Sequence, residues 1–316
     1  MEIDDLAFGC GPIGSYAADG DVGTGKAALE SALKAGVRRF DAAPSYGDGQ
    51  SEALLGAALS GWAGQRSGGA STKIAVSTKV GRTAMANANP YARPLDAGAP
   101  RGGGGYDFSA EGARGALVAG LGRLGLPLVD VLFLHDPDLA MNQARAEAMP
   151  ELARLRDEGL AGAIGVATTN PDVALAFVEE GTVEYVMIAA AWSLTRREAG
   201  PLLDRCAERG VTVQAAGPFD SGLLATARPN PAAASGYRAA TPARLEAANA
   251  LADLCERHGV TLPQAALQFP TRHPAVATVV VGMRSPAEVE ADLALIAEPV
   301  PEELWEEIDR LVDGVG

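Results

Sequence analysis

Four side chains that could carry proton chemistry stand at comparable places in the chain. Asp41, Lys79 and His135 each lie at the end of a short apolar run, and Tyr46 follows Asp41 by five residues. A lysine ammonium beside a phenol is expected to stabilise the phenolate and lower the pKa of the tyrosine from about 10, while a carboxylate keeps the lysine charged. A histidine alongside can donate a hydrogen bond to a substrate oxygen. This set suits proton transfer at a carbonyl or hydroxyl oxygen while a hydride moves to or from a nicotinamide.

Such residues can act together only if the fold gathers them at one place. Eight short apolar runs recur along the chain, each typical of a buried strand. They are 6–9, 37–42, 73–79, 129–135, 161–166, 183–190, 211–216 and 276–282. Segments with helical spacing of apolar residues lie between them, the clearest at 25–36, 51–61, 109–125, 146–159, 197–210 and 285–297.

Apolar strands that alternate with helices and lack two-residue hairpin turns indicate parallel pairing beneath a layer of helices. Eight such units favour a single-domain α/β chain, a (β/α)8 barrel over 1–316, with a doubly wound open sheet as the alternative. Neighbouring strand ends in a barrel lie about 5 Å apart, so the four polar side chains are expected to converge on one pocket. Long connections at 80–107 and 217–241 follow strands, and we expect them to form a lid at the same mouth.

A glycine pattern near the N-terminus offers a competing interpretation. The stretch "GCGPIG", from Gly9 to Gly14, matches the G-x-G-x-x-G motif that binds a pyrophosphate in dinucleotide-binding folds. That motif should open a helix, whereas here the chain is expected to continue as a loop, with helical spacing beginning only near Lys26. We therefore interpret these glycines as positions where a ligand approaches the backbone at a barrel mouth.

Composition excludes several classes of function. The chain has 316 residues and a formal net charge of −14, a balance that disfavours binding to nucleic acid or to anionic membranes. No signal-like or membrane-spanning segment is evident, and the three cysteines have no metal-type spacing. The sequence predicts a cytoplasmic enzyme that acts on a small molecule, with no metal site and with structural thiols at Cys10, Cys206 and Cys255.

Four stretches together resemble the aldo-keto reductase family. They are "RRFDAAPSYGDGQSEALLGAAL", "AVSTKVG", "LGRLGLPLVDVLFLHDPD" and "VVVGMRSPAEVEADL", and the similarity extends over nearly the whole chain. The resemblance implies a nicotinamide-dependent oxidoreductase. It also implies that Tyr46 is the general acid/base, that Lys79 tunes its pKa, that Asp41 is the partner of Lys79, and that His135 orients the substrate.

The resemblance further implies a cofactor site. The residues it points to are Gly11, Asp41, Thr168, Ser221, Gly222, Leu223, Gly282, Met283, Arg284, Glu288 and Asp292. Met283 occupies a position that is basic in the family, and Glu288 and Asp292 replace an arginine and an asparagine. Carboxylates there would repel the 2′-phosphate of NADP and could accept a hydrogen bond from a free ribose hydroxyl, so NAD is favoured. NADP stays possible because Arg284 could return a cation to the site.

Departures from the family pattern occur where the nicotinamide should bind. The family's Ser-Asn pair aligns with Ala167 and Thr168, so Thr168, Asn170 or Trp192 would have to take over its role. Tyr46, His135 and Trp192 are the predicted substrate-binding residues.

Within the family, "LFLHDPD" and "AAGPFDSGLL" resemble the aldose 1-dehydrogenases that act on L-fucose, D-threo-aldoses and L-galactose, with pyridoxal 4-dehydrogenase as a further relative. The resemblance implies oxidation of the anomeric hydroxyl of a sugar to a lactone. The alternatives are an NADPH-dependent aldehyde or ketone reductase, pyridoxal 4-dehydrogenase, and a non-catalytic barrel that senses the nicotinamide redox state.

Overall fold

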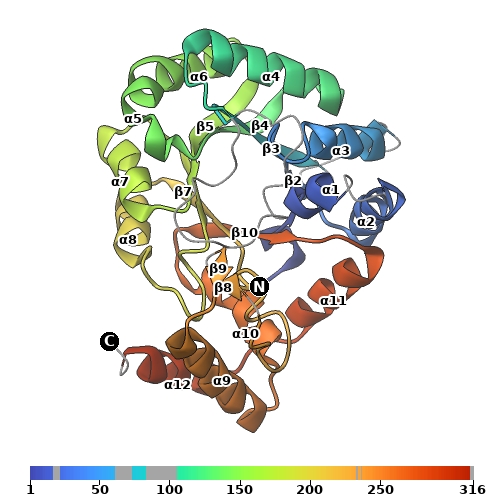
Figure 1. Cartoon of the computed structure of the whole chain (residues 1–316), viewed down its shortest axis with the longest axis vertical. Helices are drawn as coiled ribbons and strands as arrows, with labels where there is room; N and C mark the ends of the chain where they lie inside the picture. Colours follow the sequence, from blue (N-terminus) through green and yellow to red (C-terminus); the bar gives the residue numbers. More distant parts are fainter. Residues whose placement is uncertain (17–21, 61–72, 83–104, 233, 236, 314–316) are drawn as a thin grey trace.

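A closed barrel of eight parallel strands organises the chain. The computed structural model describes residues 1–16, 22–60, 73–82, 105–232, 234–235 and 237–313. The strands follow one another around the barrel in the order β1-β10-β7-β6-β5-β4-β3-β2 (Figure 1). They are β1 Leu6–Gly9, β2 Arg39–Asp41, β3 Ala75–Val80, β4 Val129–His135, β5 Ala161–Thr168, β6 Tyr185–Ala189, β7 Thr212–Ala216 and β10 Val276–Gly282. These strands match the eight predicted runs to within about two residues at each boundary, so the (β/α)8 barrel is confirmed and the open sheet is excluded.

Helices surround the barrel (Figure 1). They are α1 Gly11–Tyr16, α2 Val22–Ala35, α3 Gln50–Ser60, α4 Ala110–Leu124, α5 Met141–Gln143, α6 Met149–Asp157, α7 Pro171–Glu180, α8 Gly200–Arg209, α9 Pro242–Arg257, α10 Leu262–Gln268, α11 Pro286–Ala297 and α12 Glu302–Asp313. Around the ring α2 packs on α3 and α11, α3 on α4, and α4 on α6. Short 3-10 turns cover Ile3–Asp5, Pro137–Leu139 and Phe269–Arg272, and one π-helical turn covers Ala144–Ala148.

Local signals explain where several helices begin and end. Ser109, Asn170 and Ser285 each accept a backbone N–H of the first helical turn, because a short polar side chain can satisfy a donor that has no partner within the helix. The helices α4 and α7 end at Gly125 and Gly181, whose φ angles of 64° and 68° are left-handed and favour glycine.

Register across the first four strands positions the polar side chains. Asp41 on β2 is paired with Ser77 on β3, and Lys79 on β3 is paired with Phe133 on β4. Successive residues of a strand point to opposite faces, so Asp41, Ser77 and Lys79 share the inner face. The apolar interior cluster that includes Phe133, Met187 and Val280 fills the barrel beneath them. The fold therefore delivers these polar groups to the mouth of a packed barrel.

Two sequence expectations about local structure were wrong. The segment after β1 was expected to be a loop, but Gly11–Tyr16 forms the helix α1 and the next helix starts at Val22 rather than near Lys26. The reason is a tertiary contact: a Cβ on Gly14 would lie 2.5 Å from the carbonyl oxygen of Tyr46, so a helix can pack there only through glycine.

The two long connections each lie between a barrel strand and the next α-helix, the first between β3 and α4 and the second between β7 and α9. Of the 80–107 connection, residues 83–104 lie outside the described part of the chain. The 217–241 connection includes a short antiparallel pair, β8 Ala234–Ser235 and β9 Arg238–Ala239, which the sequence did not predict.

Candidate active site

A buried ion pair lies at the centre of the site. Lys79 Nζ is 2.6 Å from Asp41 Oδ2 and donates a second hydrogen bond, of 2.9 Å, to the Ala42 carbonyl. The other carboxylate oxygen of Asp41 accepts from Ser77 Oγ at 2.7 Å. Lys79 is 1% and Asp41 3% exposed, so the pair is desolvated and each member depends on the other. The ammonium is therefore fixed in position.

Tyr46 lies against this ammonium. The centre of its ring is 4.8 Å from Lys79 Nζ, a distance typical of a cation–π contact. The turn that follows contains three consecutive left-handed residues, Gly47, Asp48 and Gly49, with φ of 61°, 55° and 82°. A Cβ on Gly47 would lie only 1.9 Å from the Gly14 carbonyl oxygen. The glycines of the "GCGPIG" stretch thus serve a role the sequence did not reveal, because Gly14 lets α1 support the Tyr46 turn.

His135 completes the group of four. Its ring meets the Tyr46 ring edge to face, with centroids 5.8 Å apart, and its Nδ1 lies 3.4 Å from Ser45 Oγ. Burial, followed by the positive charges of Lys79 and Arg82, holds the pKa of His135 well below its usual range. The imidazole is therefore uncharged near pH 7 and can act as a hydrogen-bond donor.

The pKa of Tyr46 moves in the direction opposite to the one predicted from the sequence. Burial and then the charge of Asp41 raise the pKa of Tyr46 well above its usual range, and Arg82 only partly opposes them. The physical reason is that the charge of Lys79 is compensated by Asp41 at 2.6 Å, so the phenol faces a nearly neutral pair in a desolvated place. A raised pKa favours the protonated phenol near neutral pH, which suits a general acid directly.

The predicted nicotinamide side is built around Thr168 at the end of β5. Thr168 Oγ1 donates to Asp138 at 3.0 Å and accepts from the Asn170 N–H at 3.0 Å. Trp192 lies elsewhere: its indole N–H donates to the Pro270 carbonyl at 3.3 Å and its ring packs on Phe269. The structure thus places Thr168 at a strand end of the mouth, whereas these contacts of Trp192 are with the 3-10 turn Phe269–Arg272 that precedes β10.

The loop after β7 is tightly wound. Asp220, Ser221 and Gly222 all have positive φ angles, of 46°, 59° and 99°. Gly222 and Leu223 are among the predicted cofactor residues, and their N–H groups donate to carbonyls of the same turn, at 3.0 and 3.3 Å. In this structure both N–H groups are therefore already engaged within the loop.

A buried carboxylate ties that loop to its neighbours. Asp220 is fully buried and its Oδ2 accepts from Thr195 Oγ1 at 2.8 Å and from Ser235 Oγ at 2.6 Å. Ser221 Oγ accepts the N–H of Tyr237 at 2.8 Å. The short β8–β9 pair is thereby held at the mouth, where Tyr237 is among the groups that raise the pKa of Tyr46.

The end of β10 carries the residues predicted to choose between NAD and NADP. Arg284 turns back onto Glu288, with its Nε 2.8 Å and its backbone N–H 2.7 Å from the carboxylate oxygens. Burial and the charge of Glu288 raise the pKa of Asp292 to about 7. Met283 is completely buried in the main core. A Cβ on Gly282 would lie 2.7 Å from Pro12.

The groups at this end are carboxylates and one cation, which can hold hydroxyl groups of a nicotinamide cofactor. The only cation that the described residues place beside Glu288 there, Arg284, is compensated by that carboxylate. Carboxylates accept hydrogen bonds from hydroxyl groups and repel phosphate. Gly11, also predicted for the cofactor, is the first residue of α1 at the same mouth.

Sequence reasoning missed several residues of the site. Ser77 and Ser45 were not singled out, nor was the ion pair of Arg82 and Asp136, whose Nη1 and Oδ2 lie 2.8 Å apart. Their signal is positional: Arg82 follows β3 by two residues and Asp136 directly follows β4. The three cysteines are free and buried, in agreement with structural thiols.

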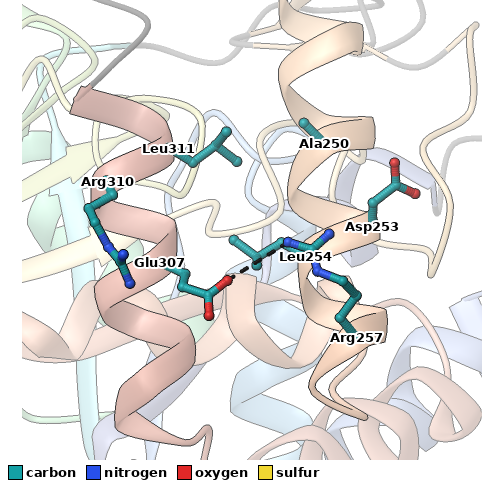
Figure 2. Close-up of a pocket in the computed structure, with 7 residues that line it drawn as sticks. All are labelled: Ala250, Asp253, Leu254, Arg257, Glu307, Arg310 and Leu311. Carbon is teal, nitrogen blue, oxygen red and sulfur yellow. Dashed lines mark ion pairs between the residues drawn. The ribbon is translucent and has the colours of Figure 1, made fainter.

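A separate surface groove lies away from this site. Figure 2 shows it between α9 and α12, with an ion pair between Arg257 and Glu307. Its volume is about 490 Å³, and the two ion-paired atoms lie 3.8 Å apart. Its lining residues are Ala250, Asp253, Leu254, Arg257, Glu307, Arg310 and Leu311. Both helices lie at the outer edge of the molecule (Figure 1), so the groove does not contain the residues gathered at the barrel mouth.

No cluster of three or more His, Cys, Asp or Glu side chains suited to a metal ion occurs in the described ranges. In those same ranges no helix is long and apolar enough to cross a membrane.

A phenol with a raised pKa, a fixed ammonium and an imidazole with a lowered pKa lie together at the mouth of a (β/α)8 barrel, an arrangement typical of enzymes that move a proton at a substrate oxygen. Comparisons with known proteins agree with that class. The Aldo/keto reductase family model matches residues 6–313. The chain therefore belongs to the aldo/keto reductase family and is an NAD(P)-dependent oxidoreductase that acts on a small molecule.

Individual relatives cover almost the whole chain. D-threo-aldose 1-dehydrogenase from Pseudomonas sp is 33% identical over 324 residues, which span 98% of this chain and 94% of that protein. Pyridoxal 4-dehydrogenase from Microbacterium luteolum is 29% identical over 330 residues, spanning 96% and 93%. The solved holo form of an aldo-keto reductase from Bacillus halodurans shares the fold, with a TM-score of 0.73 and 24% identity over 97% of this chain and 91% of that one.

Proposed function

We propose that the protein oxidises the anomeric C1 hydroxyl of an aldose to a lactone with NAD as the hydride acceptor. The observation that carries the chemistry is the Lys79 ammonium, fixed by Asp41 at 2.6 Å and lying 4.8 Å from the centre of the Tyr46 ring. The choice of an aldose is supported by the 33% identity to D-threo-aldose 1-dehydrogenase.

In this proposal the protein's own groups handle the proton. The bound nicotinamide supplies the site that accepts the C1 hydride. The Tyr46 oxygen takes the hydroxyl proton, which requires its phenolate form beforehand, and the positive charge of Arg82 favours that form. His135 donates a hydrogen bond to the substrate oxygen and so orients the C1–H bond. In the reverse direction the protonated Tyr46 returns its proton to the carbonyl oxygen.

Two carboxylates at the end of β10 favour NAD over NADP. Glu288 compensates Arg284 through hydrogen bonds of 2.7 and 2.8 Å, and Asp292 lies close enough for the charge of Glu288 to raise its pKa. A 2′-phosphate would have to displace the carboxylate from Arg284. The proposed holders of the adenosine end are Arg284, Glu288 and Asp292, with Gly11, Gly282 and Met283 as neighbouring backbone. Thr168, Ser221, Gly222 and Leu223 are proposed for the nicotinamide and pyrophosphate end.

A second candidate is pyridoxal 4-dehydrogenase activity. The 29% identity to the pyridoxal 4-dehydrogenase from Microbacterium luteolum favours it. Pyridoxal also forms a cyclic hemiacetal, so the same proton transfer at a ring hydroxyl would apply.

A substrate panel tests the proposal. Initial rates of oxidation are measured with L-fucose, D-threo-aldoses, L-galactose, pyridoxal and simple primary alcohols, each with NAD and with NADP. Rates of reduction are measured with simple aldehydes and NADPH. The proposal expects the highest kcat/KM for an aldose with NAD, together with formation of the lactone. Faster turnover of pyridoxal would select the second candidate, and faster NADPH-driven reduction of simple aldehydes would overturn both.

Binding of the reduced cofactors tests the NAD preference separately. Nucleotide fluorescence is expected to show tighter binding of NADH than of NADPH. Glu288→Gln removes the charge that compensates Arg284 and should shift the preference toward NADPH by about tenfold or more. Tighter NADPH binding by the unaltered protein would contradict the assignment.

A further inference from the structure

One carboxylate beside the active site lies between a guanidinium and an imidazole. Asp136 Oδ2 is 2.8 Å from Arg82 Nη1 and 3.8 Å from His135 Nε2. Side-chain exposure is 12% for Arg82, 21% for Asp136 and 8% for His135, so all three are largely shielded from water. The oxygen is close enough to the guanidinium for a hydrogen bond but too far from the imidazole for one.

The backbone fixes the direction of this carboxylate. Asp136 has φ 50° and ψ 59°, the left-handed region that few residues other than glycine adopt. Its N–H donates to the Ala167 carbonyl on β5 at 2.8 Å, which anchors the residue directly after β4. Backbone strain of this kind persists only where the surroundings hold it. The hydrogen bond to Ala167 therefore keeps Asp136 at the mouth beside His135.

Charged and polar groups face His135 from three elements. Lys79 lies on β3, and Arg82 lies two residues after that strand. Asp136 directly follows β4, and Tyr46 lies on the segment between β2 and α3. Burial, Lys79 and Arg82 all lower the pKa of His135. A carboxylate 3.8 Å away acts in the opposite direction, because an anion favours the protonated imidazole. The ion pair with Arg82 compensates that anion.

We propose that Arg82 is a positioning residue of the active site: by holding the Asp136 carboxylate it prevents this group from charging His135 and from drawing the Nε2–H away from the substrate oxygen. The proposal rests on the role of His135 in the proposed function. Without Arg82, Asp136 Oδ2 would need to move by less than about 1 Å to hydrogen-bond to His135 Nε2, since such bonds have lengths near 2.7–3.2 Å. The donor would then point at Asp136 instead of at the substrate.

The titration of His135 measures this effect without substrate or cofactor. Long-range ¹⁵N–¹H NMR spectra of the imidazoles are recorded against pH for the unaltered protein and for Arg82→Gln, Asp136→Asn and the double variant. The chain has three histidines, so His258→Gln and His273→Gln assign the remaining signals. Arg82→Gln is expected to raise the midpoint of the His135 titration by about one pH unit or more, because the positive charge of Arg82 is removed while the Asp136 carboxylate stays within about 4 Å.

The other variants separate this role from a merely structural one. Asp136→Asn keeps a residue that tolerates the left-handed backbone and should not raise the midpoint. In the double variant the midpoint of the His135 titration should return to near the value of the unaltered protein. In Arg82→Lys the midpoint should stay low because the positive charge remains. With a working substrate, the acid limb of kcat/KM should move upward only in Arg82→Gln.

Two results would overturn the proposal. One is a His135 midpoint in Arg82→Gln equal to that of the unaltered protein, and the other is a double variant whose midpoint stays as high as in Arg82→Gln. A uniform loss of kcat/KM at every pH, with an unmoved His135 titration, would assign Arg82 to substrate binding instead. Failure of the aldose assay would leave the NMR measurement intact, so the two proposals fail separately.

Discussion

Replacing Gly14 by alanine should impair catalysis by moving Tyr46 rather than by touching any reacting group. A Cβ at this position would lie 2.5 Å from the Tyr46 carbonyl oxygen and 3.0 Å from Ser51 Cβ. Ordinary contact begins near 3.4 Å, so the helix α1 and the Tyr46 turn must separate by about 0.9 Å. Displacement of a reacting group by about 1 Å costs on the order of 10²-fold in rate, and forced overpacking costs about 1–3 kcal/mol of stability.

The assay compares kcat, the dissociation constant of NADH and the midpoint of urea unfolding. Gly14→Ala should lower kcat by about 10²-fold at a temperature where the variant is still folded. Gly115→Ala is the matched control, because no atom lies within 4 Å of its Cβ position on α4. That control should retain full kcat, and its free energy of unfolding should increase by about 0.5–1 kcal/mol, since alanine is more favourable than glycine in a helix interior. A folded Gly14→Ala protein with kcat close to that of the unaltered chain would refute the role assigned to this contact.

Three further predictions concern the charged and titrating groups. Asp41→Asn leaves Lys79 buried without the carboxylate that lies 2.6 Å from it, so the free energy of unfolding measured in urea should fall by about 3–5 kcal/mol. An unchanged unfolding midpoint would contradict the stabilising role of this buried ion pair. Asp292 has a pKa of about 7 in the folded chain against about 4 when unfolded. The folded protein therefore loses stability as the pH rises from about 4 to about 7, because ionising the buried carboxyl is unfavourable. Asp292→Asn should therefore stabilise the protein on the order of 2–4 kcal/mol at pH 8 and much less at pH 5, and an equal gain at both pH values would disprove this linkage. The pKa of Tyr46 is raised, and oxidation needs the phenolate form. The rate of oxidation should therefore increase by up to about tenfold per pH unit between about pH 7 and pH 9, while the rate of reduction stays nearly constant. A rate of oxidation that does not change with pH would argue against Tyr46 as the base.

The barrel could be predicted from the sequence because its strands are buried on both faces. Such strands appear as short continuous apolar runs, and even the weak run at Leu6–Gly9 became a strand. The meeting of Asp41 with Lys79 followed from the same inference, since parallel strands place their carboxyl ends at one mouth.

What the sequence did not reveal depends on contacts between distant segments. The helix α1 contains Pro12 and Gly14, which disfavour helices, and it forms where Gly14 packs against the Tyr46 turn. The direction of the Tyr46 pKa depends on how completely Asp41 compensates Lys79 and on burial, and neither can be read from residue types alone. The pair of Arg82 and Asp136 becomes evident only once the register of β3 and β4 is known.

Substitution of Tyr46 by phenylalanine tests the central claim most directly. The change removes one oxygen and leaves the ring against Lys79, so the fold and the binding of NADH should be retained. Initial rates with the best aldose and NAD should fall by about 10²–10⁴-fold, the usual contribution of a positioned acid or base. A Tyr46→Phe protein that binds NADH normally and oxidises the same aldose at the rate of the unaltered enzyme would contradict the account.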